Sequence, residues 1–495
     1  MVAVLTSVSP ASLSPGPPGP VDADHTLYER VAAHVASLID GQTLRAGDRI
    51  PSVRKLSEQQ GVSVSTVLQA YLLLESRGLI ETRPQSGHYV RARLGKLAAE
   101  PKMSRPSATA TRPSVTDLVA KVYGATRDPA MVPLGAAYPG TDVLPVAKLQ
   151  RIVASIARRH GEQSISYDAP PGTLALRRQI ARRSLEWGCG FSPDDLVTTC
   201  GAMEALAISL HVVAAAGDVI AVESPTYYGV LQLIESLGMK ALEIPTHPRD
   251  GMSIDALEEA LRTTPIKAVL ATPNFNNPLG GLMSDANKKR LVELLAKQGV
   301  PLIEDDIYGD LHFSEKRPRP AKAWDKHGLV LLCSSFSKTI APGYRVGWAA
   351  PGRFRERFER MKFAYSVATA TLPQLAVAAF LDEGGYDRHL RRMRRMFFEQ
   401  VQRVSETVTA CFPAGTRVAR PAGGFVVWVE LPRDVSALEL HRLALARGIS
   451  VAPGPIFSAK GRYESCIRLN CGNPWTERIA RAIEDLGAIA TRLAR

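Results

Sequence analysis

Lys338 stands among hydroxyl-bearing residues and glycines in the stretch SSFSKTIAPGYRVGW, which spans residues 334–348. The apolar run LVLLC comes directly before it and has the character of a buried strand. Burial and nearby cations lower the pKa of a lysine amine and make it a nucleophile toward a carbonyl carbon. Arg345 supplies a cation whose planar fork of donors can grip a phosphate, and Ser335 and Ser337 add hydroxyl donors. The stretch therefore predicts a site for pyridoxal 5′-phosphate (PLP), an aldehyde that carries a phosphate.

A PLP site needs further groups around the ring, and the sequence offers them. The ring nitrogen needs an acidic partner in order to stay protonated. In VPLIEDDIYGDL, Asp305 ends an apolar run that predicts a strand, and Tyr308 follows three residues later. The ring hydroxyl needs hydrogen-bond partners, which Asn277 in PNFNNPLGG and Tyr308 can provide.

The phosphate, the ring face and a substrate carboxylate each have a candidate partner. Gly201, Ala202 and Met203 open an apolar helix in TTCGAMEALAISL, and the N–H groups of a helix start bind phosphate. Tyr227 in ESPTYYG offers an aromatic face to the ring, and Arg468 in SCIRLNCG offers a guanidinium to an amino-acid carboxylate. Each residue alone has an ordinary alternative, such as a strand-end cap, a core tyrosine or a surface ion pair. Their joint occurrence in one order is what favours the cofactor site.

This order resembles that of the aspartate-aminotransferase-like, fold type I PLP enzymes over residues 116–495. The resemblance implies that the catalytic groups are Lys338, Asp305 and Tyr308. It also implies that Tyr167, in ISYDAPPGTLALRRQIA, reaches the cofactor phosphate of a neighbouring subunit, so that the protein is a homodimer. The matching positions are Gly201, Tyr227, Asn277, Asp305, Tyr308, Lys338, Arg345 and Arg468. Two positions depart from the pattern, because Ala202 stands where relatives often have Ser or Thr and Leu279 replaces a usual Thr.

The N-terminal residues 25–93 predict a compact DNA-binding unit. Ser52 can cap a short helix that carries Val53 and Leu56 inward and ends near Gly61. A second helix is expected from Ser63, with Val64, Val67, Tyr71 and Leu74 at helical spacing toward the core. Two short helices separated by a glycine-containing turn are typical of a helix-turn-helix.

The outer face of the second helix carries short polar side chains suited to base edges and phosphates, namely those of Ser63, Ser65, Thr66 and Gln69. The runs LIETR and HYVRA then flank PQSG, which predicts a hairpin. The stretch from LRAGDRIPSVRKL to SGHYV resembles the GntR-type winged helix-turn-helix domain along its whole length. The resemblance implies binding of double-stranded DNA, with Arg54, Arg83 and Gly87 near the DNA backbone. Val64 departs from it, because many relatives carry a basic residue there.

The chain of 495 residues thus predicts several parts. We expect a disordered tail at 1–24, the winged helix-turn-helix domain at 25–93, a linker at 94–115 and an aminotransferase-like PLP-binding domain at 116–495. The predicted fold class is multi-domain, with a mostly α N-terminal domain and a C-terminal α/β domain that includes a smaller α+β subdomain. The basic run RHLRRMRRMFFEQV at 388–401 predicts a solvated helix face.

Composition sets broad limits on location and partners. Lys plus Arg number 61 and Asp plus Glu 48, and the formal charge of +13 permits a polyanionic partner. No uncharged apolar run is long enough to predict a membrane span. The six cysteines follow no metal or disulfide spacing, which favours a reducing, cytoplasmic location.

A DNA-binding head joined to a PLP-binding body resembles the MocR subfamily of GntR-type regulators. The resemblance implies a transcriptional regulator that senses an amino compound or PLP and binds an operator. Two alternatives stay open at this point. One is an active PLP-dependent aminotransferase with a regulatory head, and the other is a structural DNA-bridging protein that ignores the cofactor.

Overall fold

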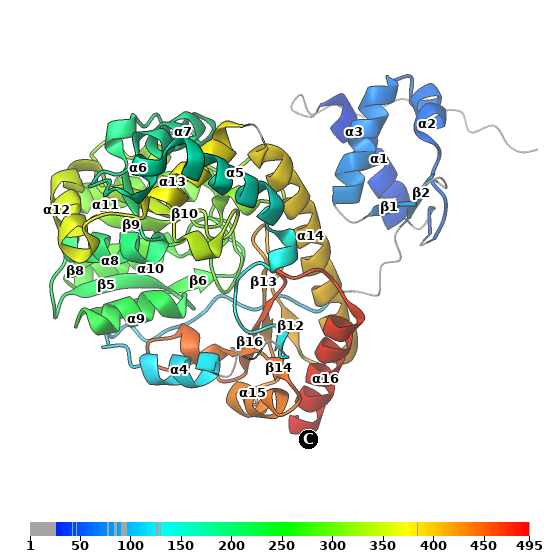
Figure 1. Cartoon of the computed structure of the whole chain (residues 1–495). Coiled ribbons are helices and arrows are strands. Elements are labelled where there is room, and N and C mark those ends of the chain that lie inside the picture. The colour runs from blue at the N-terminus through cyan, green and yellow to red at the C-terminus, as the bar shows by residue number, and fades with distance from the viewer. Residues whose placement is uncertain are drawn as a thin grey trace, which may run out of the picture. The chain divides into compact units, whose positions relative to one another are not determined.

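The computed structural model describes residues 26–41, 43–45, 47–76, 79–83, 87–90, 97–124, 128, 130–383 and 385–494. The chain divides into two compact units, Met1–Arg93 and Leu94–Arg495, whose helices and strands are labelled in Figure 1. The predicted tail at 1–24 lies outside the described residues.

The described residues of the first unit form three helices and a two-stranded antiparallel sheet around one core. Ser52 begins the second helix, because its side chain accepts a hydrogen bond from the N–H of Lys55, and Gly61 ends it in a left-handed conformation. Leu56 is buried, as the sequence predicts. The elements are α1 (Leu27–Asp40), α2 (Val53–Gln60), α3 (Val64–Ser76), β1 (Ile80–Arg83) and β2 (Gly87–Val90), and the two strands pair antiparallel.

The third helix differs from the prediction at its first turn. Val67, Tyr71 and Leu74 are buried in the core of this unit, as predicted. Val64, however, is 50% exposed, so the expectation that it faces the core is wrong. The buried stripe begins one turn later, where α1 and α2 pack against α3. Ser63 precedes the helix, and its hydroxyl accepts a hydrogen bond from the N–H of Thr66.

The second unit is built on an eight-stranded, mostly parallel sheet, as the alternation of strands and helices predicts. The strand order is β4-β11-β10-β9-β8-β5-β6-β7, and the neighbours from β10 to β6 are parallel. β11 and β7 pair antiparallel at the two sides. The strands are β4 (Val197–Thr199), β5 (Val219–Ser224), β6 (Lys240–His247), β7 (Gly251–Met252), β8 (Ile266–Ala271), β9 (Leu302–Asp305), β10 (Val330–Ser335) and β11 (Gly347–Ala350).

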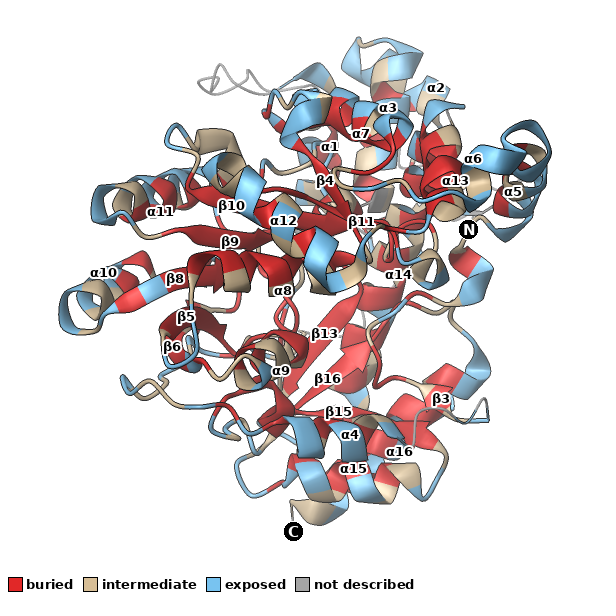
Figure 2. Cartoon of the chain, turned by 60° about the vertical axis from the view of Figure 1, so that its left-hand side comes forward, coloured by how far each residue is buried: buried red, intermediate tan, exposed pale blue. Residues whose placement is uncertain are grey.

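Helices cover this sheet on both faces, so its strands are buried and apolar (Figure 2). Those of the sheet region are α4 (Thr116–Gly124), α5 (Val146–Arg159), α6 (Gly161–Ile165), α7 (Leu174–Ser184), α8 (Ala202–Val213), α9 (Tyr228–Ser236), α10 (Ile254–Thr263), α11 (Asp285–Gln298), α12 (Arg355–Ser366) and α13 (Thr371–Asp382). Among the described residues, no helix is long and apolar enough to cross a bilayer.

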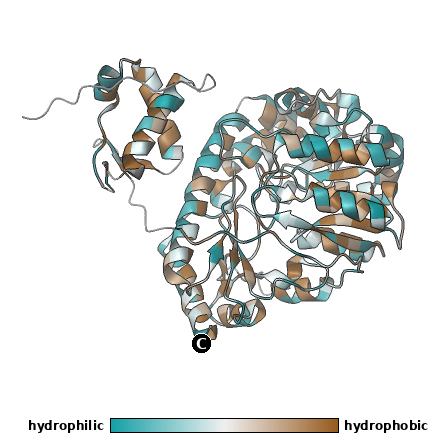
Figure 3. Ribbon diagram, turned by 180° about the vertical axis from the view of Figure 1, so that it is seen from behind, coloured by the Kyte–Doolittle hydropathy of each residue, from teal (hydrophilic) through white to brown (hydrophobic). Residues whose placement is uncertain are grey.

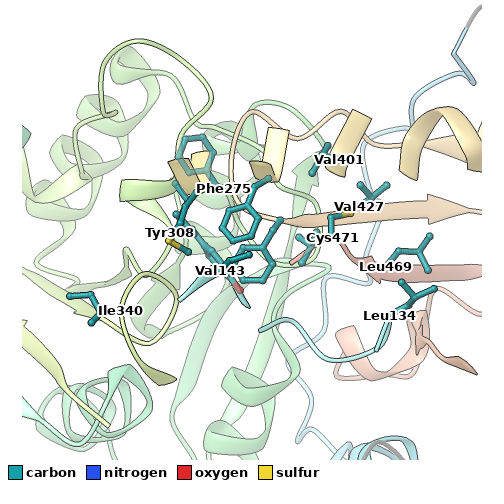
Figure 4. Packing of buried hydrophobic residues seen from close by; sticks show 14 of the residues in the cluster. Leu134, Val143, Phe275, Tyr308, Ile340, Val401, Val427, Leu469 and Cys471 are labelled. Carbon is teal, nitrogen blue, oxygen red and sulfur yellow. The ribbon is translucent and has the colours of Figure 1, made fainter. Parts of the chain in front are cut away.

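A smaller subdomain lies beside the large sheet and consists of a four-stranded sheet and helices. Its strand order is β12-β13-β16-β15. One hydrophobic cluster continues from it to the large sheet, and Figure 4 shows Phe275 and Tyr308 close together within that cluster. The elements are α14 (Tyr386–Cys411), β12 (Arg417–Val418), β13 (Val426–Glu430), α15 (Ala437–Leu445), β15 (Ala452–Pro453), β16 (Cys466–Asn470) and α16 (Glu477–Leu493), with β14 (Ile449–Ser450) paired to β3 (Val132–Pro133).

The basic stretch at 388–401 lies within α14. Leu390, Met393, Phe397 and Val401 are buried on one side of the helix. The arginines of this stretch lie mostly on the solvent side, and Figure 3 shows hydrophilic and hydrophobic residues alternating along α14.

Residues 97–115, which we call the connecting segment, lie along the second unit. They fall within the stretch 94–115 that composition predicts as a linker, yet they are held by specific contacts. The carboxylate of Glu100 pairs with Arg249, beside the large sheet, and with Arg420 of the smaller subdomain. Hydrogen bonds also join Ala98 to Thr409, Ala99 to Val418, Ser104 to Thr246 and Thr111 to Ala241. An extended chain can satisfy its backbone groups in this way without apolar periodicity of its own.

Candidate cofactor site and DNA-binding surface

A cavity of about 330 Å³ opens at the carboxyl ends of the central parallel strands. Ligands of α/β sheets bind at this edge, because the loops and helix N-termini converge there. Ten of the residues that the sequence singles out line the cavity: Ala202, Met203, Tyr227, Asn277, Asp305, Tyr308, Ser335, Ser337, Lys338 and Arg345. Residues that are 143 positions apart in the chain are thus brought to one place by the sheet.

Lys338 follows β10 and points its amine into the cavity. The Nζ atom donates a hydrogen bond to the carbonyl of Ala137 at 2.7 Å. Burial lowers the pKa of this amine to about 8, with Arg468 and Arg345 lowering it further and Asp305 opposing them. A substantial fraction of the amine is therefore neutral, and nucleophilic, near neutral pH.

Asp305 ends β9, the parallel neighbour of β10. Burial raises the pKa of its carboxyl to about 7, and the nearby charge of Asp306 adds to the effect. One carboxylate oxygen accepts a hydrogen bond from the N–H of Ile307 at 3.2 Å. A cation placed against this carboxyl would favour its charged form.

Three polar side chains surround the space between Lys338 and Asp305. Tyr308 is buried, and its ring meets the ring of Phe425 edge to face with the centroids 5.7 Å apart. Burial also raises the pKa values of Tyr227 and Tyr308, so both hydroxyls stay protonated. The Oδ1 atom of Asn277 accepts a hydrogen bond from Arg468.

An anion cradle lies at the start of α8. Gly201 precedes this helix with φ +81°, a region that favours glycine. The Nη2 atom of Arg345 donates to the carbonyl of Cys200 at 3.2 Å, and its Nη1 atom lies 3.5 Å from the hydroxyl of Ser337. A Cβ atom at Gly201 would lie 2.5 Å from Arg345 Nη2, so glycine leaves the space that the guanidinium occupies. Helix N–H groups, a guanidinium and serine hydroxyls together form a phosphate-binding set.

Arg468 is fully buried beside the cavity but does not line it. Its Nη1 atom donates to Asn277 at 3.0 Å. Its Nη2 atom donates to the hydroxyl of Tyr123 at 3.0 Å and to the carbonyl of Gly135. Its Nε atom has no hydrogen-bond partner among the described residues.

Tyr167 lies outside the cavity of its own chain. It follows α6, and it is 86% exposed, beside Ile165 at 87%. Two large apolar side chains left in solvent so close together are unusual for a surface that contacts only water.

The structure adds site residues that the sequence analysis missed. Tyr228, next to Tyr227, also lines the cavity, and the doublet in TYYG was an available signal. Tyr123, Tyr138 and the carbonyl of Ala137 gave no motif signal, because they belong to segments far from the predicted residues in the chain.

These residues fit PLP in charge and in shape. An amine with a lowered pKa, a carboxyl at one end and an anion cradle at the other match the aldehyde, the ring nitrogen and the phosphate. When bound, PLP supplies an aldehyde for an amine and a ring that withdraws electrons. The loss of one phosphate hydroxyl at Ala202 leaves Ser335, Ser337 and Arg345 in place.

The predicted DNA-binding residues lie on the first unit. Ser65 and Gln69 are exposed on α3, while the hydroxyl of Ser63 lies 2.8 Å from those of both Ser65 and Thr66. Arg54 is exposed on α2, and Gly87 begins β2 with φ +113°. The side chain of Arg83 lies outside the described residues, as does the turn at 84–86.

α3 also exposes an apolar row that the sequence analysis did not assign to DNA. Val64, Leu68 and Leu72 recur every four residues and are each about half exposed. Apolar side chains of a recognition helix can contact thymine methyl groups.

Comparison with known proteins identifies both units. Residues 132–486 match the family described as aminotransferase class I and II. Residues 27–90 match the family described as bacterial regulatory proteins, gntR family. The fold and the cavity therefore define a GntR-type DNA-binding domain joined to a fold type I, PLP-binding aminotransferase domain.

Relatives with the same two-part organisation narrow the class. The chain is 39% identical to the uncharacterized HTH-type transcriptional regulator YjiR of Escherichia coli, over 94% of this chain and 99% of that protein. It is also 39% identical to YdcR of E. coli, another uncharacterized HTH-type transcriptional regulator, over 93% and 98%. The chain belongs to the MocR subfamily of GntR-type transcriptional regulators.

A solved enzyme structure resembles the second unit. LysN, the α-aminoadipate aminotransferase of Thermus thermophilus, was crystallised with N-(5′-phosphopyridoxyl)-L-leucine. It matches with a TM-score of 0.70 and 28% identity, over 77% of this chain and 99% of that one.

The lowered pKa of Lys338 gives a pH prediction. Only the neutral amine adds to an aldehyde, and its fraction rises about tenfold per pH unit below the pKa. We expect the rate at which PLP becomes attached to the PLP-free protein to rise from pH 6 and level off above about pH 8. Borohydride reduction and peptide mass mapping at timed intervals measure this rate at Lys338. Nα-acetyl-lysine under the same conditions is the control. A protein profile that levels off only near the pKa of the Nα-acetyl-lysine amine would contradict the prediction.

The anion cradle gives a second prediction. Gly201→Ala places a methyl group against Arg345 and forces a side chain into a positive-φ conformation. We expect the dissociation constant for PLP to rise about five- to thirtyfold, since strain of roughly 1–2 kcal/mol opposes the backbone geometry that forms the cradle. Gly343→Ala is the matched control, because a Cβ there meets nothing within 4 Å. Equilibrium dialysis measures the affinity of each variant for PLP. Equal affinities of Gly201→Ala and Gly343→Ala would show that the cradle tolerates a side chain.

Proposed function

We propose that the protein is a PLP-dependent transcriptional regulator that binds an operator through its first unit and senses an amino compound, or PLP itself, through its second. The proposal is carried by the combination of two features in one chain. The helix α3 exposes polar side chains, and the cavity of the second unit holds Lys338, a buried lysine whose pKa is lowered. Its E. coli relatives with the same organisation are named as transcriptional regulators.

In this proposal, the side chains around the cavity, together with Arg468, divide the work of binding. Lys338 bonds covalently to the cofactor, and Asp305 pairs with the ring nitrogen through a carboxyl that ends β9. Tyr308 and Asn277 donate to the ring hydroxyl, while Arg468 receives the carboxylate of the amino compound. The ring stacks on Tyr227, and the phosphate binds at Gly201, Ala202, Met203, Ser335, Ser337 and Arg345. A ligand regulates DNA binding only if it binds two conformations of the protein unequally.

We also infer a cytoplasmic homodimer. The 86% exposure of Tyr167 supports a position against a second copy, where it would reach the partner's phosphate. Two copies bring two recognition helices to two half-sites, which raises affinity through effective concentration. In each copy Ser63, Ser65, Thr66 and Gln69 would face the major groove, with Arg54, Arg83 and Gly87 near the backbone. All six cysteines are free, which agrees with a reducing compartment.

A second candidate function is transamination. The presence of Lys338, Asp305 and Arg468 together favours transamination. A lysine with a pKa near 8 can move a proton at the Cα atom of a bound amino acid. The same residues would then serve an enzyme whose head is regulatory.

The deciding experiment measures DNA binding and turnover on the same preparation. Full-length protein with PLP is titrated with single amino acids and amines against its own promoter in a gel-shift assay, while keto acid is measured in parallel. We expect at least one compound to change operator affinity several-fold with little or no keto acid formed. Lys338→Ala should keep basal DNA affinity but lose the response and the visible absorbance of bound PLP. Rapid turnover without promoter binding would support the enzyme instead.

Arg54 gives a prediction for the DNA-binding surface. It is exposed on α2, and removal of a phosphate contact weakens binding to all sequences alike. We expect Arg54→Ala to reduce the slope of log affinity against log salt by about 1. Gln60→Ala, an uncharged change on the same helix, is the control. Fluorescence anisotropy from 50 to 300 mM salt measures the slope, and an unchanged slope would show that Arg54 does not reach the backbone.

A further inference from the structure

The guanidinium of Arg468 has one edge that is only partly satisfied. This edge consists of Nε and Nη2, whose N–H groups point the same way. Nη2 donates to the Tyr123 hydroxyl at 3.0 Å and to the carbonyl of Gly135, but Nε has no partner among the described residues. The whole side chain is buried, so bulk solvent does not reach this N–H group.

Tyr123 supplies one of the two acceptors that contact Nη2 on this edge. Its hydroxyl donates to the carbonyl of Gly135 at 3.1 Å while it accepts from Arg468, so it closes a small polar cluster. Its ring packs at 5.0 Å from that of Tyr228, which lines the cavity with it. Tyr123 therefore stands between the cavity and the arginine that the proposed function assigns to a ligand carboxylate.

A carboxylate matches the Arg468 edge better than a hydroxyl does. Two carboxylate oxygens can accept from Nε and Nη2 together, in the parallel geometry that guanidinium groups favour. Such a pair satisfies the unpartnered Nε and replaces a neutral acceptor with a charged one, which makes the stronger hydrogen bond. Nε and Nη2 carry three N–H groups, so a bidentate carboxylate leaves one N–H group for two acceptors, the Tyr123 hydroxyl and the Gly135 carbonyl. The hydroxyl can move away with its side chain, whereas the carbonyl is fixed in the backbone.

We propose that a ligand carboxylate displaces the Tyr123 hydroxyl from Arg468 and thereby loosens the end of α4, so that this helix reports whether the carboxylate site is occupied. The proposal rests on the proposed function for the role of Arg468, and it adds the displaced group and the element that responds. Tyr123 acts as a positioning residue, because it works through Arg468.

α4 is suited to such a report because its two ends are held differently. At its start, the N–H groups of Val115 and Thr116 donate to Glu235 of α9 at 3.0 and 3.2 Å. Near its end, the hydrogen bonds of Tyr123 include the one that a carboxylate would replace. The helix follows directly on the connecting segment, which lies between it and the first unit in the sequence.

The test uses the PLP-bound full-length protein and an amine-free probe. 3-Phenylpropionate carries a carboxylate and a ring suited to a tyrosine-lined cavity, and 3-phenylpropanamide is its uncharged counterpart. We expect Tyr123→Phe to bind the carboxylate about tenfold more tightly than the wild-type protein, since the competing hydroxyl is gone. Its affinity for the amide should not change. Tyr365→Phe is the matched control, because it removes a hydroxyl that contacts His211 away from the cavity.

Hydrogen exchange of peptides that cover α4 gives the second readout. In the wild-type protein we expect 3-phenylpropionate, but not the amide, to speed exchange over residues 116–124. In Tyr123→Phe this exchange should already be fast without ligand, while exchange in the central sheet stays slow and shows that the fold is intact. Equal carboxylate affinity in both proteins, no binding to either, or α4 exchange that ignores the carboxylate would each overturn the proposal.

Operator binding separates this inference from the function on which it rests. If the carboxylate speeds α4 exchange while operator affinity stays constant, the displacement stands and the regulatory function fails. If a ligand changes operator affinity while α4 exchange does not respond, the regulatory function stands and the displacement fails.

Discussion

The amine of Lys338 is buried near the guanidinium groups of Arg345 and Arg468, and this crowding of cations constrains the larger unit. Burial and both cations lower the amine's pKa to about 8, against the opposing charge of Asp305. Groups like these stay together only if rigid elements hold them. Lys338 follows β10 and Asp305 ends β9, and the parallel register that pairs Cys333 with Asp305 brings both to one edge of the sheet. The amine of Lys338 and the carboxyl of Asp305 are thus adjacent because parallel strands end together.

Three buried carboxyl groups near the carboxyl ends of the parallel strands differ in the groups that surround them. Burial raises the pKa of Glu223 to about 8, so it is largely neutral at pH 7 and accepts a hydrogen bond from the N–H of Thr272. Asp306 instead forms an ion pair with Arg317 at 2.5 Å. Asp305 lies between these cases, with a pKa raised to about 7 and no ion pair among the described residues. It is the carboxyl that a ring cation would complete.

Contacts outside the cavity join the ligand site to the chain that leads toward the DNA-binding unit. Glu100 in the connecting segment holds Arg249 and Arg420, which belong to the two parts of the second unit. Tyr123, at the end of the helix that follows this segment, contacts the buried Arg468. Through these contacts, the position of the connecting segment or of α4 would depend on a ligand bound at Arg468. Such a dependence is what a ligand-responsive regulator requires.

The sequence by itself determined the local elements and the kinds of chemistry. Ser52 and Gly61 marked the ends of α2, apolar runs marked β9 and β10, and the motifs around Lys338, Asp305 and Gly201 identified a phosphate-bearing aldehyde. These signals are local, because caps, periodicity and turn residues act within a few positions of the chain. Only the tertiary structure decided which distant groups meet. Lys338 donates to Ala137, 201 residues away, and Arg468 to Tyr123, 345 residues away, while a stretch with linker composition lies along the body. Val64 faces solvent for the same reason, since helix packing, and not spacing alone, sets where a buried stripe begins.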